Sequence, residues 1–346
     1  MPNKTFPAAV SFHKSENKSY KSNSSESFAE QIANAVEVQE IDTNLYMSKE
    51  LWLPPGARGV FGGQIVAQAL RAAFHTVPDD FRVHSLHSYF ILPGNVEYPV
   101  IYQVERLRDG RSYNTRVVTA SQRGKAIFVS SCSFAKLDNK SVTLNHQTAM
   151  PEVPDPESLP SETERVHSIL NDLPPKYREY LESRLEEASP MDYRDVYQRS
   201  ITEVTTGVTE PRETQYRWFK TQGKLNDDPK LHACIIAYAS DSAFIGTAAV
   251  ANGVSQRGIG MMASLDHSMW FHADARADDW LLYEMYSPRT NQGRGVAFGK
   301  IFARDGTLVV TTAQEGVLRL SRKEQEKRRQ QQQQQQETSS NRSSKL

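Results

Sequence analysis

Cysteine is scarce in this sequence: its 346 residues include only two, Cys132 and Cys234. Both lie among small or apolar residues, a setting typical of a buried packing residue rather than of a metal ligand or a disulfide partner. The low count favours a reducing compartment and argues against a small, disulfide-stabilised secreted protein.

Long apolar runs and an excess of either charge are also missing. No stretch approaches the roughly 18 consecutive apolar residues of a membrane span, and the N-terminus lacks the apolar core of a signal peptide. We therefore expect a soluble protein that is not secreted. Lys plus Arg equals Asp plus Glu, at 41 each. With no net charge, the chain has no global field that would attract nucleic acid.

Several catalytic motifs are absent as well. No Gly-x-Ser-x-Gly sequence occurs, so acyl transfer of the α/β-hydrolase type lacks its nucleophile. The chain also has no P-loop, no Gly-x-Gly-x-x-Gly, no His-Glu-x-x-His and no paired cysteine motif. These absences leave no sequence signal for a phosphate-binding loop or a metal site.

Composition divides the chain into five segments. Residues 1–30 are rich in Ser, Lys and Asn, with too few apolar side chains to offset the entropy cost of ordering, which predicts disorder. Residues 138–190 begin with prolines and acidic residues, which predict a linker, and continue with an amphipathic stretch that predicts a helix. Residues 322–346 form a polar, Gln-rich tail without an apolar stripe. The folded material is therefore expected at 31–137 and 191–321.

The two folded segments share a sequence pattern. A His-Ser pair at His84 is followed 26 residues later by a Gly-Arg pair at Gly110, and the pairs at His267 and Gly293 repeat this interval. The constant offset of 183 residues suggests an internal duplication, provided that the secondary structure repeats too.

The expected secondary structure does repeat. Helices are predicted at 64–74 and 231–244, and both are apolar or small on nearly every face, which suits a helix enclosed by a curved antiparallel sheet. Each is followed by strand-like runs rich in Val, Ile, Tyr and Phe. The pattern predicts an α+β fold of two tandem repeats, each with a central helix wrapped by a sheet. The runs lie at 84–92, 97–107, 112–121 and 125–135, and at 261–271, 280–287, 295–304 and 307–319.

Asp241 is the strongest functional candidate, because it closes the apolar helix of the second half. A carboxylate at the C-terminal end of a buried helix loses hydration and meets the negative end of the helix dipole. Both effects make it a better proton acceptor. A solvated Asp241 just outside the core is the alternative that the residues alone leave open.

Ser264 and Gln314 lie in predicted strands of the same half. Period-two alternation places Ser264 and Asp266 on one face and His267 on the other, so spacing does not decide which face is catalytic. Gln314 interrupts a mostly apolar strand, where a buried amide would need hydrogen-bond partners. An exposed or edge-strand Gln314 is the alternative.

Glycines stand at the start of the first helix. Gly59, Gly62 and Gly63 would let the free N–H groups of that helix approach an incoming carbonyl or phosphate closely. We take Gly62, Gly63 and Gln64 as candidates for oxyanion or substrate binding. A turn before a helix uses glycine in any case, so the motif alone is not specific.

Five stretches of the chain resemble the acyl-CoA thioesterase II family of double hot-dog enzymes. The resemblance covers nearly all of residues 35–320 outside the linker. It is specific, because several long motifs occur in the right order. The matching stretches are Arg58–Leu70, Val83–Phe90 with Pro93 and Gly94, Val104–Ser112, Leu265–His272 and Gln314–Val317.

The resemblance implies a double hot-dog fold and hydrolysis of fatty acyl-CoA thioesters to free acid and coenzyme A, with no metal or bound organic cofactor. Motif matching carries the family's catalytic roles to Asp241, Ser264 and Gln314. A water molecule held by Ser264 and Gln314 would lose its proton to Asp241 while attacking the thioester carbonyl. A homo-oligomer is implied too. The offset of 183 residues places Ser131 opposite Gln314, which predicts no active site in the first half.

Ser344, Lys345 and Leu346 spell the tripeptide that the peroxisomal import receptor recognises. They predict a location in the peroxisomal matrix, where acyl-CoA is made or consumed in β-oxidation. Two other functions remain open from the sequence. One is a hot-dog enoyl-CoA hydratase or dehydratase, and the other is a non-catalytic acyl-CoA-binding sensor.

Overall fold

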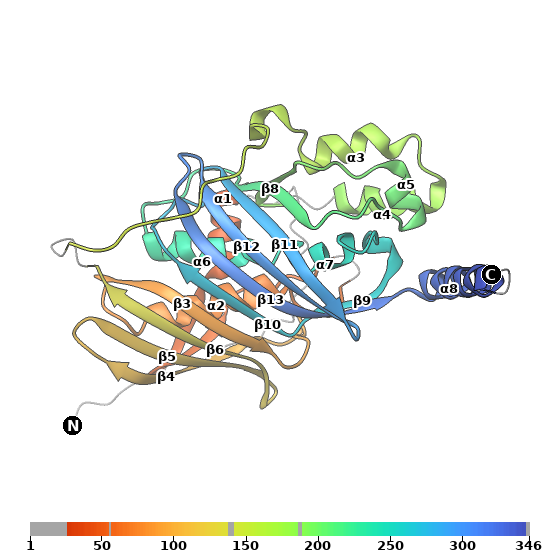
Figure 1. Ribbon diagram of the computed structural model, residues 1–346. Helices are drawn as coiled ribbons and strands as arrows, with labels where there is room; N and C mark the ends of the chain where they lie inside the picture. The colour runs from red at the N-terminus through yellow and green to blue at the C-terminus, as the bar shows by residue number, and fades with distance from the viewer. Residues whose placement is uncertain (1–25, 55–56, 138–141, 186–188, 344–346) are drawn as a thin grey trace, which may run out of the picture.

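The computed structural model describes residues 26–54, 57–137, 142–185 and 189–343. Its first half begins with a short helix, continues with a hairpin and a long central helix, and ends in a four-strand meander (Figure 1). These elements are α1 (Phe28–Val36), β1 (Val38–Asp42), β2 (Leu45–Ser48), α2 (Gly62–Phe74), β3 (Phe81–Phe90), β4 (Ile101–Asp109), β5 (Tyr113–Gln122) and β6 (Lys125–Lys136).

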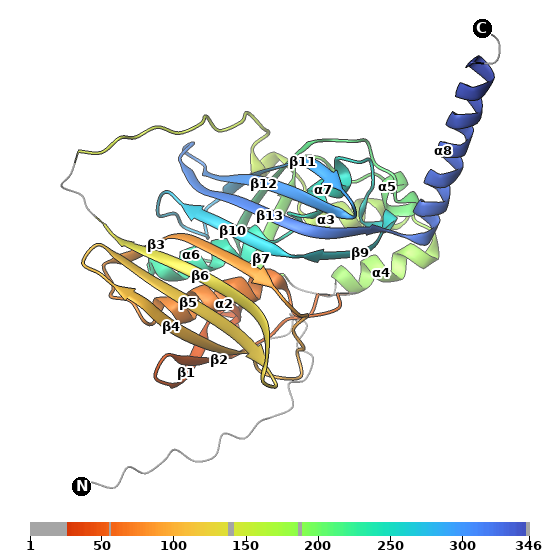
Figure 2. The ribbon, with the colours of Figure 1, turned by 60° about the horizontal axis from the view of Figure 1, so that its bottom comes forward.

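The second half repeats this order after a helical connection and adds a long C-terminal helix that projects away from the body (Figure 2). The connection holds the 3₁₀ turn Pro156–Ser158, α3 (Glu162–Leu170) and α4 (Pro175–Leu185). The repeat holds β7 (Met191–Asp195), α5 (Ile201–Thr206), β8 (Thr214–Thr221), α6 (Pro229–Ser240), α7 (Gly246–Val250), the 3₁₀ turn Gln256–Gly258, β9 (Ile259–Ser264), β10 (Asp266–Phe271), β11 (Leu281–Asn291), β12 (Arg294–Ala303), β13 (Leu308–Leu320) and α8 (Arg322–Ser343).

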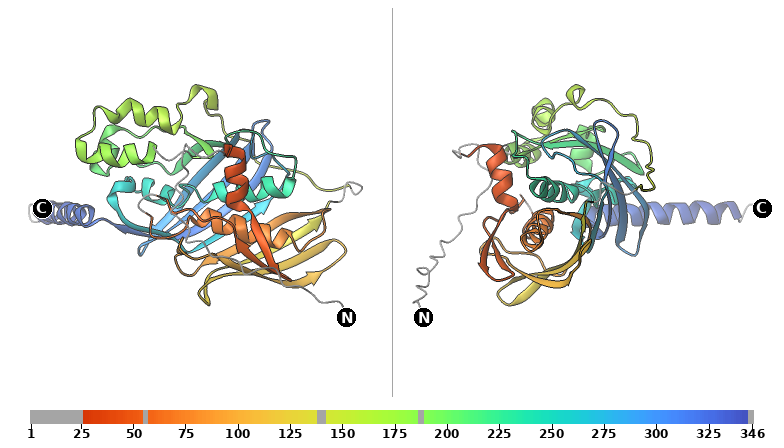
Figure 3. Two further views of the ribbon diagram at one scale, coloured as in Figure 1. Left: turned by 180° about the vertical axis from the view of Figure 1, so that it is seen from behind. Right: turned by 90° about the vertical axis from the view of Figure 1, so that its left-hand side faces the viewer.

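All strands belong to one 13-stranded antiparallel sheet, in the order β1-β2-β4-β5-β6-β3-β10-β13-β12-β11-β8-β7, with β9 also paired to β13. The two halves join where β3 pairs with β10, with Tyr89 opposite Asp266 and Ser85 opposite Trp270. Each half of the sheet curls around its own central helix, α2 or α6 (Figure 3). This arrangement is the predicted double hot-dog fold.

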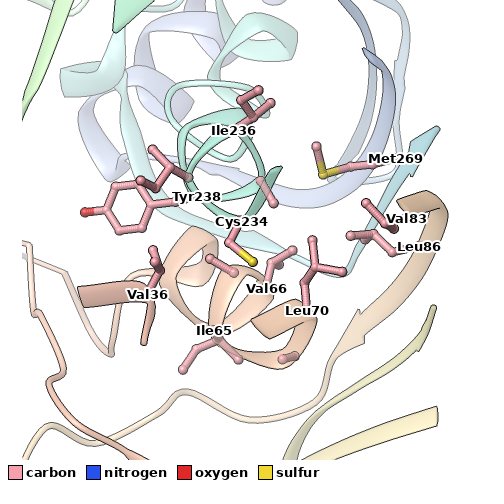
Figure 4. Packing of buried hydrophobic residues seen from close by; sticks show 14 of the residues in the cluster. Val36, Ile65, Val66, Leu70, Val83, Leu86, Cys234, Ile236, Tyr238 and Met269 are labelled. Carbon is pink, nitrogen blue, oxygen red and sulfur yellow. The ribbon is translucent and has the colours of Figure 1, made fainter. Parts of the chain in front are cut away.

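The two central helices pack against each other as well as against their sheets. Val66 and Leu70 of α2 face Cys234 of α6 in one continuous apolar core (Figure 4). Nearly every residue of both helices is buried, as their apolar composition predicts. Cys132 and Cys234 are both buried and free, which confirms their prediction as packing residues.

The ends of two predicted segments differ from the structure. Helix α1 begins at Phe28, inside the predicted disordered segment 1–30, because Ser27 and Glu30 form a reciprocal capping box; residues 1–25 lie outside the described residues. Helix α6 ends at Ser240 rather than at Phe244, because Ala243 has a positive φ of 61° that no helix accommodates. Within the described part of the chain, no helix is both long and apolar enough to cross a membrane.

Gly63 allows α2 and α6 to approach closely, so we expect Gly63→Ala to destabilise the protein. An added Cβ would overlap the backbone oxygen of Tyr238 and the ring of Phe61. Overpacking of this kind costs about 1–3 kcal/mol, measurable by urea denaturation. The matched control is Gly246→Ala, where a Cβ meets no atom within 4 Å. Equal unfolding midpoints for the two variants would contradict this account of the helix contact.

Candidate active site

Asp241 lies where the C-terminal end of α6 meets the N-terminal end of α2. It is the C-cap residue of α6 and is half-buried. A Cβ built on Gly62 would lie 2.6 Å from Asp241 Oδ2. At the other end of the pair, Asp228 of the α6 N-terminus contacts Arg71 of α2 at 3.0 Å, so the helices run antiparallel. The carboxylate therefore lies beside the first residues of α2, at the positive end of that helix dipole.

Asp241, Ser264 and Gln314 form a closed triangle of hydrogen bonds. Gln314 Nε2 donates to Asp241 Oδ1 at 2.6 Å and to Ser264 Oγ at 3.0 Å. Ser264 Oγ donates to Asp241 Oδ1 at 3.4 Å. Gln314 is only 1% exposed, so its amide is an interior group. The structure thus brings together three residues that lie up to 73 positions apart in the chain.

The orientation of the Gln314 amide follows from its partners. An ionised carboxylate only accepts hydrogen bonds, so the nitrogen must face Asp241. Both hydrogens of Nε2 are then used, one on Asp241 and one on Ser264. Gln314 Oε1 is buried and has no hydrogen-bond partner among the described residues.

A bulge between β9 and β10 turns Ser264 and His267 to the same side of the sheet. Leu265 N–H donates to the Glu315 oxygen, and Glu315 N–H donates to the Asp266 carboxylate instead of to a backbone carbonyl. The extra residue breaks the alternation of the strand. The prediction that Ser264 shares a face with Asp266, opposite His267, is therefore wrong.

His267 is fully buried against the last turn of α6. Its Nε2 lies 2.9 Å from Ser240 Oγ, the residue before Asp241. Burial lowers the pKa of His267 to about 4, against a smaller opposing effect of the Asp241 carboxylate. The imidazole is therefore neutral near pH 7. Strand alternation excluded His267 from the site because the bulge is not visible in the sequence.

The three candidates at the start of α2 differ in what their atoms contact. Gly62 lies beside Asp241, and the first N–H groups of a helix have no carbonyl four residues back to bind, so the Gly62 and Gly63 amides remain candidates. The Gln64 side chain is fully buried and fully used. Its Nε2 donates to two backbone oxygens, and its Oε1 accepts from Trp52 N–H at 2.8 Å. Its side chain is structural, so its prediction as a substrate-binding residue is corrected.

The first half does not repeat the triangle. His75 is the C-cap residue of α2, where α6 has Asp241, and it contacts Glu37 at 3.1 Å. Strand pairing matches Gln314 to the buried Phe134 rather than to the exposed Ser131, because the β5–β6 hairpin is three residues longer than β12–β13 between equivalent pairs. Phe134 packs edge-on against the ring of Phe74. An aromatic contact thus replaces the polar group.

A cavity of about 440 Å³ lies at the opposite end of the helix pair, beside the α2 C-terminus. Its cations are already neutralised: Arg71 pairs with Glu37 and Asp228, and Lys230 pairs with Asp79. None of the triangle residues lines it. No group of three or more His, Cys, Asp or Glu side chains that could hold a metal ion occurs among the described residues.

Two family models match the chain. The model described as "Acyl-CoA thioesterase" matches residues 185–317, and the model described as "Acyl-CoA thioesterase N-terminal domain" matches residues 49–135. Together the two matches span both repeats.

Individual relatives agree with the family models. The chain is 42% identical to acyl-coenzyme A thioesterase 8 of Mus musculus, over 84% of this chain and 89% of the relative. It is 29% identical to the peroxisomal acyl-coenzyme A thioester hydrolase 1 of Saccharomyces cerevisiae, over 76% of this chain and 86% of the relative. The crystal structure of acyl-CoA thioesterase II TesB2 from Mycobacterium marinum matches with a TM-score of 0.66 at 33% identity, over 84% and 99% of the two chains.

Because His267 is buried and neutral, stability should fall at acidic pH. The unfolded imidazole takes up a proton below about pH 6.5, whereas the folded one stays neutral down to a pKa of about 4. The free energy of unfolding is therefore lost as pH falls from 6.5 towards 4. Between pH 7 and pH 5, urea denaturation should show a loss on the order of 2 kcal/mol in the wild type that His267→Gln lacks. A parallel decline in both proteins would contradict this.

Proposed function

We propose, from the premise that this chain belongs to the acyl-CoA thioesterase II family and is a thioester hydrolase, that Asp241, Ser264 and Gln314 activate the water that hydrolyses a fatty acyl-CoA. The observation that carries the proposal is the hydrogen-bonded triangle of these three side chains at the end of α6. No group in the triangle is a nucleophile activated by a neighbouring imidazole, so water is the attacking species.

The hydrogen-bond capacity that remains in the triangle fits one water molecule. Asp241 Oδ1 already accepts from Gln314 and Ser264, which leaves Oδ2 to accept from water. Ser264 Oγ gives its hydrogen to Asp241 and accepts one from Gln314, so one lone pair remains. A water that donates to both Asp241 and Ser264 directs its own lone pair away from them, towards the substrate. Gln314 fixes the relative positions of the two acceptors.

The reaction then follows from general base catalysis. The water oxygen forms a bond to the thioester carbonyl carbon while its proton passes to Asp241. The tetrahedral intermediate collapses, the C–S bond breaks, and the coenzyme A thiolate takes the proton from Asp241. The products are a free fatty acid and coenzyme A.

The N–H groups of Gly62 and Gly63 are our candidates for stabilising the oxyanion of that intermediate. They open α2, where the helix dipole is positive, and Gly62 lies against Asp241 Oδ2. The absence of a side chain at Gly62 lets a carbonyl oxygen approach the backbone closely. The charge that develops on the carbonyl oxygen and the water activated by Asp241 would thus lie on either side of the same carbon.

We further propose that the protein acts in the peroxisomal matrix, in fatty-acid metabolism linked to β-oxidation. Ser344, Lys345 and Leu346 would be the ligand of the import receptor, and these residues lie outside the described residues. The printed name of the yeast relative, which includes "peroxisomal", supports this location. A homo-oligomer is a further proposal, which rests on the family resemblance alone.

Asp241→Asn should remove the general base while keeping the shape of the side chain. We expect kcat to fall about 10²–10⁴-fold, followed as free thiol released from acyl-CoA. The control is Asp266→Asn, because Asp266 contacts the Glu315 N–H outside the triangle and asparagine keeps an acceptor oxygen. A near-normal kcat in Asp241→Asn would remove this residue from the mechanism. Tight acyl-CoA binding by the wild type without thiol release would favour a sensor instead.

Removal of the last three residues should abolish peroxisomal import. A fluorescent protein fused to the N-terminus should move from peroxisomes to the cytosol when Ser344–Leu346 are deleted, because the receptor reads the terminal tripeptide directly. Ser343→Ala, one residue before the tripeptide, is the matched control and should leave import unchanged. Peroxisomal fluorescence of the truncated chain would contradict the proposed signal.

A further inference from the structure

We propose that His267 and Ser240 are positioning residues that hold the Asp241 carboxylate in place for catalysis. This inference rests on the proposed function, because it assumes that Asp241 is the base. Neither residue belongs to the hydrogen-bonded triangle. Both are fully buried directly behind it, with 0% exposure.

The direction of the hydrogen bond between His267 and Ser240 can be derived. Ser240 Oγ donates its only hydrogen to the Ala237 oxygen at 2.8 Å; the sulfur of Met269, at 3.5 Å, is a weaker acceptor. In the 2.9 Å contact with His267, Ser240 Oγ must therefore accept, and His267 Nε2 must carry the hydrogen. The imidazole is thus fixed as its Nε2–H tautomer by the residue immediately before Asp241.

The carbonyl of Ser240 is held from the other side. Tyr283 OH donates to the Ser240 oxygen at 3.0 Å, and Thr312 Oγ1 lies 2.9 Å from the same hydroxyl. His267 is on β10, Thr312 on β13 and Tyr283 on β11. Gln314, which binds Asp241 directly, is also on β13. The last turn of α6 is therefore tied to the same part of the sheet that carries the rest of the triangle.

The other ring nitrogen of His267 argues for a role beyond stability. Nδ1 is buried and has no hydrogen-bond partner among the described residues. A buried acceptor without a partner costs about 1–3 kcal/mol, so an apolar residue would be the more stable occupant. Departures from local satisfaction of this kind are expected at functional sites. The feature that an apolar residue cannot supply is the Nε2 hydrogen on Ser240.

The test uses the full chain and measures kcat and KM for acyl-CoA hydrolysis. Ser240→Ala removes the acceptor, and His267→Asn cannot place a donor at the Nε2 position. A displacement of about 1 Å costs up to about 10²-fold, so we expect kcat to fall about 10- to 100-fold with KM nearly unchanged. His267→Gln, whose amide nitrogen reaches the Nε2 position, should recover most of kcat. The double variant should be no worse than either single one.

Tyr102→Phe is the matched control. Tyr102 is fully buried in the first half, and its hydroxyl donates to Gln68 Oε1 at 2.7 Å, so the variant loses a buried hydrogen bond far from Asp241. Its kcat should stay near that of the wild type. A wild-type kcat in Ser240→Ala, or an equal loss in Tyr102→Phe, overturns the inference. Ser240→Ala alone decides the matter if the His267 variants do not fold, because alanine suits a helix.

The outcome is separable from that of the proposed function. If Asp241→Asn is inactive and Ser240→Ala is normal, the base is right and the positioning role is wrong. If Asp241→Asn is normal, the proposed mechanism fails, and the positioning role fails with it.

Discussion

The close contact between the start of α2 and the end of α6 is the constraint on which the active site depends. Gly62 and Gly63 have no side chains, so the backbone of one repeat can lie directly against the carboxylate and the last carbonyl groups of the other. A carboxylate at the negative end of α6 would be disfavoured there alone. The opposing positive end of α2 offsets this effect and supplies unpaired N–H groups beside the same atom. The catalytic end of each helix is therefore defined by its partner.

Sequence patterns predicted the elements whose composition reflects burial and missed those whose composition does not. The helices α2 and α6 are apolar on every face, and the four strands after each follow the expected order. The strands β1, β2, β7 and β8 were not predicted. β1 is exposed at all but one of its residues, and β7 reads Met-Asp-Tyr-Arg-Asp, so their pairing depends on neighbouring strands rather than on an apolar pattern.

The triangle of Asp241, Ser264 and Gln314 was reached through family resemblance, since single residues left each position ambiguous. The bulge at Leu265 is the reason that alternation could not place Ser264, because a single extra residue reverses the facing of all that follow. Gln64 shows the opposite failure. It stands at the right place in the chain beside Gly63, yet its amide joins α2 to two other segments of the first repeat, and only the contacts reveal this.

The seam between β3 and β10 gives the molecule the geometry of a heterodimer whose subunits share one backbone. A homodimer of identical repeats would have to present the same chemistry at both ends of its helix pair, since symmetry relates them. Fusion removes that obligation. One end could keep a polar water-binding set while the other exchanged it for His75 and an aromatic contact. The covalent link thereby turned two equivalent sites into one site and one stabilising end.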